Sequence, residues 1–77
     1  MITAHDIQID ARGLNCPLPV LRAKRTMGHM QRGQVLRVRA TDAGSVKDFE
    51  AFCRQSGNER VSFEESGGEY IFRLRKS

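Results

Sequence analysis

The spacing of apolar residues constrains the fold of this chain more than any other feature. The spacing is two in some segments, as in strands, and three or four in others, as in helices. Residues 6–10 (DIQID) and residues 34–40 (QVLRVRA) alternate apolar and polar side chains, as half-buried strands do. Between them the apolar residues recur at spacings of three and four, the stripe of a helix from about residue 17 to residue 31, made of Val20, Ala23, Met27 and Met30. Gly33 is a natural stop for this helix. The first half of the chain therefore predicts a strand, a helix and a second strand.

A second helix is predicted after a short turn over residues 41–45. Ser45 is placed to be its N-cap, and Asp48 three residues later is a weaker capping partner. Its apolar stripe contains Val46, Phe49 and Cys53, with Phe52 beside it. Gly57 is expected to end this helix.

Two strands joined by a tight turn are predicted at the end of the chain. Residues 59–66 and 69–75 alternate, and Gly67-Gly68 between them is typical of a hairpin. The predicted order is βαβαββ, and both strand–helix–strand connections are long enough to place their helices on one face of the sheet. We therefore expect an α/β fold in one domain over residues 1–77: a two-layer α/β sandwich, with a four-stranded mixed sheet and two helices on one face.

The sheet face away from the helices is predicted to be basic. Alternation places four arginines on it: Arg37, Arg39, Arg73 and Arg75. With a net charge of +4 and a pI near 9.7, this face is a candidate binding surface for RNA or for an acidic protein. Sheets that read RNA stack bases on exposed aromatic side chains, whereas most aromatic residues here fall on core-facing positions. An acidic partner protein or plain solvent is therefore the favoured interpretation, and direct nucleic-acid binding is not expected.

Composition argues against a membrane-spanning, disulfide-built or metal-binding protein. Apolar residues make up 39% of the chain and charged residues 29%, as in an ordinary globular domain. No apolar run approaches the roughly 20 residues that cross a bilayer, and the first ten residues lack the pattern of a signal peptide. Two cysteines are too few for a disulfide framework, and His5 and His29 have no metal-ligand spacing with them. We expect a cytoplasmic protein with free thiols, no metal and no cofactor.

Cys16 lies in an unusual context, because Cys16-Pro17-Leu18-Pro19 stands where the first helix begins. Prolines are tolerated in the first turn of a helix, where the backbone N–H groups have no intrahelical partner, so they stiffen the start at little cost. A cysteine at a helix N-terminus has its thiolate stabilised, which lowers its pKa to roughly 3.5–7.5. Arg12 could add positive charge. We therefore predict an exposed, nucleophilic Cys16, while free cysteines are more often small buried hydrophobes, and the residues alone leave both interpretations open. Cys53, within the apolar stripe of the second helix, is interpreted as core packing.

The stretch from Asp10 to Leu21, DARGLNCPLPVL, resembles the signature of the TusA/SirA-like sulfur-carrier family, in which a C-P-x-P motif opens the first helix. The resemblance extends over nearly the whole chain, and further similar residues are Gly33, Asp42, Asp48, Phe52, Cys53, Gly57 and the final strand. The βαβαββ order also agrees with this family.

The resemblance implies that Cys16 accepts sulfane sulfur as a persulfide, commonly from a cysteine desulfurase, and relays it to an acceptor protein. It further implies that Pro17 and Pro19 form the mount of Cys16, while Asp10 and Gly13 match the motif without an assigned role. Leu18 is a departure, since well-known tRNA-thiolation members carry an acidic residue there. A leucine beside the sulfur suggests an apolar contact with the partner. A carrier that shows its cysteine to successive proteins works most simply as a monomer.

Overall fold

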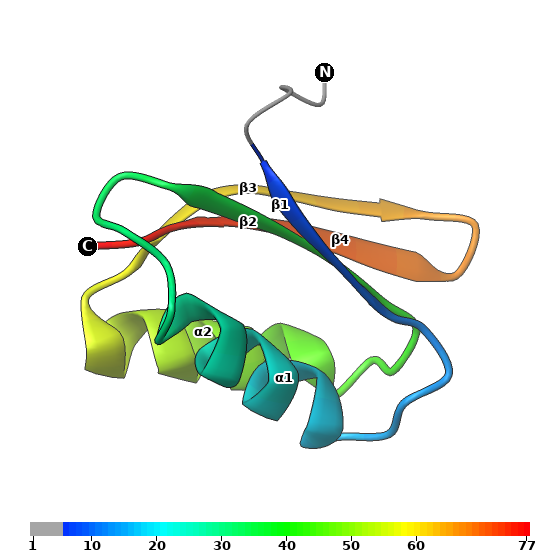
Figure 1. Cartoon of the computed structure of the whole chain (residues 1–77). Helices are drawn as coiled ribbons and strands as arrows, with labels where there is room; N and C mark the ends of the chain where they lie inside the picture. The colour runs from blue at the N-terminus through cyan, green and yellow to red at the C-terminus, as the bar shows by residue number, and fades with distance from the viewer. Residues whose placement is uncertain (1–5) are drawn as a thin grey trace.

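A computed structural model describes residues 6–77 of the chain as two layers, a sheet and a pair of helices on one of its faces (Figure 1). The elements in chain order are β1 (Ile7–Ala11), α1 (Leu18–Met27), β2 (Val35–Ala40), α2 (Ser45–Ser56), β3 (Glu59–Ser66) and β4 (Glu69–Arg75). The strands are arranged in the order β1-β2-β4-β3. The predicted two-layer α/β sandwich with βαβαββ order is therefore confirmed.

The sheet is mixed, and its register follows the alternation of side chains. β1 pairs with β2 in parallel, with Ile9 opposite Val38, and β2 pairs antiparallel with β4, with Val38 opposite Phe72. β3 and β4 form the predicted hairpin, whose turn contains Gly67 and Gly68, both at positive φ. Because side chains alternate across a strand, this register gathers the apolar set on the face under the helices.

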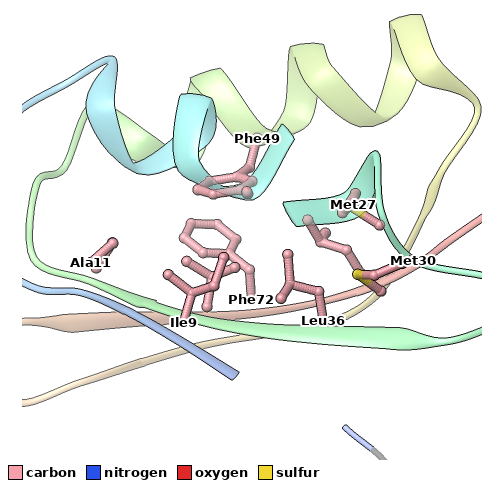
Figure 2. Close-up of a cluster of buried hydrophobic side chains, with 11 residues drawn as sticks. Ile9, Ala11, Met27, Met30, Leu36, Phe49 and Phe72 are labelled. Atoms are coloured by element: carbon pink, nitrogen blue, oxygen red, sulfur yellow. The ribbon is translucent and has the colours of Figure 1, made fainter. Parts of the chain in front are cut away.

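The core lies between the sheet and the helices (Figure 2). Phe49 from α2 stacks on Phe72 from β4, with ring centroids 4.4 Å apart, and both side chains are fully buried. Around this pair the sheet contributes Ile9, Ala11, Leu36, Val38, Ala40 and Leu74, and α1 and the turn after it contribute Ala23, Met27 and Met30. The alternating and helical apolar patterns of the sequence thus converge on one core.

The first helix is shorter than predicted. It ends at Met27, whereas the apolar stripe extends to Met30. After Gly28 the chain tightens into turns in which the N–H of His29 bonds to the carbonyl of Thr26, and that of Met30 to Met27. Met30 still packs in the core, as its place in the apolar stripe predicted, although it lies beyond the end of the helix.

The start of the second helix also differs from the prediction. Gly44 is the N-cap, and Ser45 is the first helical residue, with a buried side chain whose hydroxyl has no hydrogen-bond partner among residues 6–77. The side chain of Asp48 does not cap this helix, because it accepts a hydrogen bond from Cys16. The end of the helix is as predicted, with Gly57 in the left-handed region at φ 79°. In residues 6–77 neither helix has the length and apolarity that a membrane span requires.

Candidate functional site

Two loops that follow neighbouring parallel strands build the candidate site. β1 and β2 run side by side in the same direction, so the loops after Ala11 and Ala40 lie at the same end of the sheet (Figure 1). The N–H of Gly13, at φ 80°, donates a hydrogen bond of 2.9 Å to Oγ1 of Thr41 and ties one loop to the other. Gly13 matters here because few other residues adopt this left-handed conformation without strain.

Cys16 lies exposed at the end of the first loop, on a stiff support. The Cys16–Pro17 peptide bond is cis, Pro17 is the N-cap of α1, and Pro19 in the first turn is buried. The N–H of Leu18 donates a hydrogen bond of 2.8 Å to the carbonyl of Asn15. The helix was predicted to begin at Pro17 and begins one residue later.

Two carboxylates from the second loop and α2 hold Cys16. The backbone N–H of Cys16 donates a hydrogen bond to Oδ2 of Asp42, whose Oδ1 accepts another from the N–H of Gly44 at 3.0 Å. The thiol Sγ of Cys16 donates to Oδ2 of Asp48 at 2.5 Å. Asp42 thus fixes the backbone of Cys16, and Asp48 fixes its sulfur.

These contacts overturn the predicted acidity of Cys16. The hydrogen bond to Asp48, with partial desolvation and the nearby charges of Asp48 and Asp42, raises the pKa of the Cys16 thiol to about 11, whereas a lowered value was expected. The helix N-terminus does not offset this effect. Pro17 and Pro19 have no N–H, and the N–H of Leu18 is already bonded to a carbonyl. At rest Cys16 is therefore a thiol.

The sequence suggested that Arg12 adds positive charge near Cys16, but the structure directs its guanidinium to another partner. Its Nε donates to Oδ1 of Asp10 at 2.8 Å and its Nη2 donates to Oδ2 at 2.8 Å, so the two side chains form a bidentate ion pair. The side-chain and backbone hydrogen bonds from Arg12 hold the pKa of Asp10 well below its usual range. Asp10, Arg12 and Gly13 thus shape the loop before Cys16, and none of these three residues forms a hydrogen bond with its sulfur.

Gly44 is part of the site, and sequence reasoning missed it. A Cβ at this position would lie 3.2 Å from Cβ and 3.4 Å from Sγ of Cys16. Its backbone is in the ordinary right-handed region, so the reason for glycine here is the close approach of Cys16 and not conformational freedom. No signal in a single sequence distinguishes such a glycine from one in an ordinary turn.

Cys53 lies apart from this chemistry. It is half-buried in α2 and packs against the core, as predicted, and burial raises the pKa of its thiol.

The four arginines of the open sheet face are not brought together with Cys16, because the helices that carry the site cover the opposite face (Figure 1). Three of them are already paired with carboxylates within the chain. These pairs are Arg39 with Glu69 at 2.7 Å, Arg73 with Asp6 at 3.0 Å, and Arg75 with Glu59 at 2.7 Å. Arg37 makes no ion pair with residues 6–77 in the structure. The basic surface is thus weaker than the count of arginines suggested.

Exposed apolar side chains follow Cys16 in the first turn of α1. Leu18 and Leu21 are about half exposed. A shallow groove of about 170 Å³ between the helices begins beside the site, and its lining includes Pro17, Leu21, Asp48 and Phe52. Within residues 6–77 no group of three or more His, Cys, Asp and Glu side chains is arranged to hold a metal ion, while His5 lies outside the described residues.

Comparison with known proteins decides the family. The family described as Sulfurtransferase TusA matches residues 7–76, nearly the whole chain. The chain belongs to the TusA family. It is 58% identical over 72 residues to the sulfur carrier protein TusA of Allochromatium vinosum, which covers 94% of this chain and 95% of that one. It is 39% identical over 72 residues to the sulfur carrier protein TusA of Pseudomonas entomophila, with 94% of this chain and 90% of the relative covered.

The fold agrees with this membership of the TusA family. The crystal structure of a SirA-like protein from Desulfitobacterium hafniense superimposes with a TM-score of 0.80 at 27% identity, over 90% of this chain and 95% of that one. The resemblance inferred from the sequence is therefore confirmed, and with it a sulfur-transfer role at the level of the family.

Proposed function

We propose that this chain carries sulfane sulfur as a persulfide on Cys16. A donor protein such as a cysteine desulfurase loads the thiol, and an acceptor protein takes the sulfur away. The observation that carries the proposal is the placement of Cys16: an exposed thiol on a proline-stiffened support, fixed to Asp42 and Asp48, in a chain of the TusA family. Exposure gives access to two different partners, and a fixed position keeps the sulfur in one geometry for both.

The second cysteine fits a carrier better than a dithiol oxidoreductase. A resolving thiol beside the carrier would discharge the persulfide as a disulfide. Cys53 is half-buried in the middle of α2 and serves packing. We infer that only Cys16 exchanges sulfur with partners, and that Pro17 and Pro19 act through its position.

Partner contacts are proposed to surround Cys16 on the helix side of the molecule. Leu18 follows the support of the thiol directly and is half exposed, so it offers an apolar contact to a docked protein. The arginines of the open face lie on the other side of the sheet and are mostly paired. We therefore assign them at most a secondary part in docking. The acceptor belongs to tRNA thiolation, to cofactor maturation or to general sulfur trafficking in the cytoplasm.

Transfer of radiolabelled sulfur tests this proposal. The protein is incubated with a cysteine desulfurase and radiolabelled cysteine, beside Cys16→Ala and Cys53→Ala. We expect label that dithiothreitol removes on the wild type and on Cys53→Ala, and none on Cys16→Ala. Equal labelling of all three proteins, or no labelling of the wild type, would refute it.

A further inference from the structure

Asp48 is the side chain in closest contact with the reacting sulfur. It projects from the first turn of α2, and its Oδ2 lies 2.5 Å from Sγ of Cys16. The backbone of Cys16 is anchored separately by Asp42, and Gly44 leaves the space between the loop and the thiol free of a side chain. The geometry of the Cys16–Asp48 pair is thus imposed from several directions, as expected for groups that act together.

We propose that Asp48 is a catalytic residue of sulfur transfer, which accepts a hydrogen bond from the Cys16 thiol at rest and takes up its proton as the sulfane sulfur bonds to Sγ. This inference rests on the proposed function, because it assigns the proton of that same transfer step. General bases act within about 2.6–3.2 Å of the proton-bearing atom, and the contact of Asp48 is at least as close as this.

The loading step balances without any added oxidant. Sγ of Cys16 attacks the terminal sulfur of a cysteine persulfide on the donor protein. The new Sγ–S bond forms as the donor S–S bond breaks, and the electron pair of the broken bond leaves on the donor thiolate. The proton of Cys16 passes to Asp48 and then to that thiolate. Cys16 gives up two electrons and is oxidised to a persulfide. The donor persulfide gains these two electrons and is reduced to a thiol.

A carboxylate is a sufficient base for this step although it is a weaker base than a thiolate. At rest the proton stays on the sulfur. Once Sγ shares its lone pair with the incoming sulfur, it becomes a three-bonded cationic sulfur, whose proton is strongly acidic. Asp48 then accepts the proton readily. Discharge is the reverse sequence, in which Asp48 returns a proton to Sγ as the sulfur moves to the acceptor.

The same carboxylate makes Cys16 unreactive toward reagents that need a free thiolate. The two charged groups that act on the thiol are the carboxylates of Asp48 and Asp42, from α2 and from the loop before it, and both disfavour the thiolate. A thiol in this setting alkylates slowly at neutral pH. Removal of the Asp48 charge should therefore have opposite effects on alkylation and on sulfur loading.

An Asp48→Asn variant in the Cys53→Ala background tests the proposal, since Cys16 is then the only thiol. At pH 7 we expect iodoacetamide alkylation to become several-fold faster, and at most about tenfold, because desolvation and Asp42 still disfavour the thiolate and the thiolate gained has a lower intrinsic nucleophilicity. Loading from a charged cysteine desulfurase should become about 100-fold slower, the usual contribution of a general base. Glu50→Gln on the same helix makes the same change of charge away from the thiol, and should alter neither rate. Asp48→Glu retains a carboxylate and should load faster than Asp48→Asn.

The signs of the two effects separate the possible results. If Asp48→Asn accelerates both reactions, the carboxylate only disfavours the thiolate and the proposal is wrong. It is equally wrong if both reactions slow together, if neither changes, or if Glu50→Gln has the same effects. Failure of the wild type to accept any sulfur would instead refute the proposed function, and the assigned proton transfer with it. Normal loading by Asp48→Asn would refute the proton transfer alone.

Discussion

At the scale of single residues, the site depends on short polar contacts and on a glycine, which has no side chain to clash with the thiol. Cys16 is held at its N–H by Asp42 and at its sulfur by Asp48, and Gly44 gives it room. The motif therefore does not act by making the thiol acidic. We infer that Pro17 and Pro19 position the sulfur, while the carboxylates of Asp48 and Asp42 raise its pKa.

Replacement of Gly44 should impair the site without unfolding the protein. In Gly44→Ala the new Cβ would lie 3.2 Å from Cβ of Cys16, so the Cys16 side chain must shift by a few tenths of an ångström, which disturbs its contact with Asp48. Alanine is compatible with the right-handed backbone there, so stability should change by less than about 1 kcal/mol. Persulfide loading and thermal unfolding measure the two effects. Gly28→Ala, also at a right-handed glycine but at the end of α1, is the matched control, and equal loading by both variants would contradict the prediction.

Asp42 should stabilise the fold in a pH-dependent way. The hydrogen bond from the N–H of Cys16, followed by that of Gly44, lowers the pKa of Asp42 in the folded state. Its contribution is therefore complete above the unfolded carboxyl pKa of about 4 and is lost as pH falls through the lower folded value. The wild type should be more stable than Asp42→Asn by a constant amount above about pH 5, and the difference should shrink in acid. Urea unfolding at several pH values measures it, and a difference that grows in acid would contradict this.

At the scale of elements, the packing of α2 on the sheet places Asp48 and Gly44 at Cys16. Phe49, next to Asp48 in the chain, is buried against Phe72 and fixes how this helix turns toward the site. The core and the chemistry therefore use adjacent residues of one helix, and the orientation of α2 serves both.

Loss of the Phe49 ring should destabilise the protein strongly. Phe49→Ala leaves a cavity at the centre of the core and should cost about 3–5 kcal/mol of unfolding free energy. Phe63→Ala on β3 removes the same ring from a position that is 36% exposed, and should cost less than about 1.5 kcal/mol. Urea denaturation compares them. Similar losses in the two variants would contradict the central place of Phe49.

Much of the element pattern was predictable, because alternation and helical spacing directly report which face is buried. The spans of β3 and β4 and the stop at Gly57 agree with the sequence. The site was less predictable. The approach of Asp48 to Cys16 joins residues 32 positions apart, and it depends on how α2 packs, which no local pattern records. The predicted low pKa of Cys16 was wrong for the same reason, since only the partners of the thiol reveal the sign of the change.

At the scale of the whole molecule, the two faces differ in character. The helix side presents a thiol, exposed leucines and a shallow groove, whereas the open sheet face presents arginines that are largely neutralised by their own carboxylates. The net charge of +4 therefore gives a poor estimate of how attractive this sheet face is to phosphate groups.

Removal of two carboxylates should strengthen binding of RNA to the sheet face. In the double variant Glu59→Gln, Glu69→Gln, the side chains of Arg75 and Arg39 lose their partners. The dependence of affinity for single-stranded RNA on salt should become steeper by about 1.4 in the log–log slope, for two added phosphate contacts. Titrations of a fluorescent RNA oligonucleotide at several salt concentrations measure it. Tight binding by the wild type, unchanged in the double variant, would contradict the neutralised face and favour an RNA-binding role.

The central claim is that Cys16 is the residue that carries sulfane sulfur in this TusA-family chain. Peptide mass mapping of the wild type after loading by a cysteine desulfurase tests it most directly. The account predicts one extra sulfur atom on the peptide that contains Cys16, removed by dithiothreitol, and none on the peptide that contains Cys53. Extra sulfur on the Cys53 peptide, or on neither peptide, would contradict it.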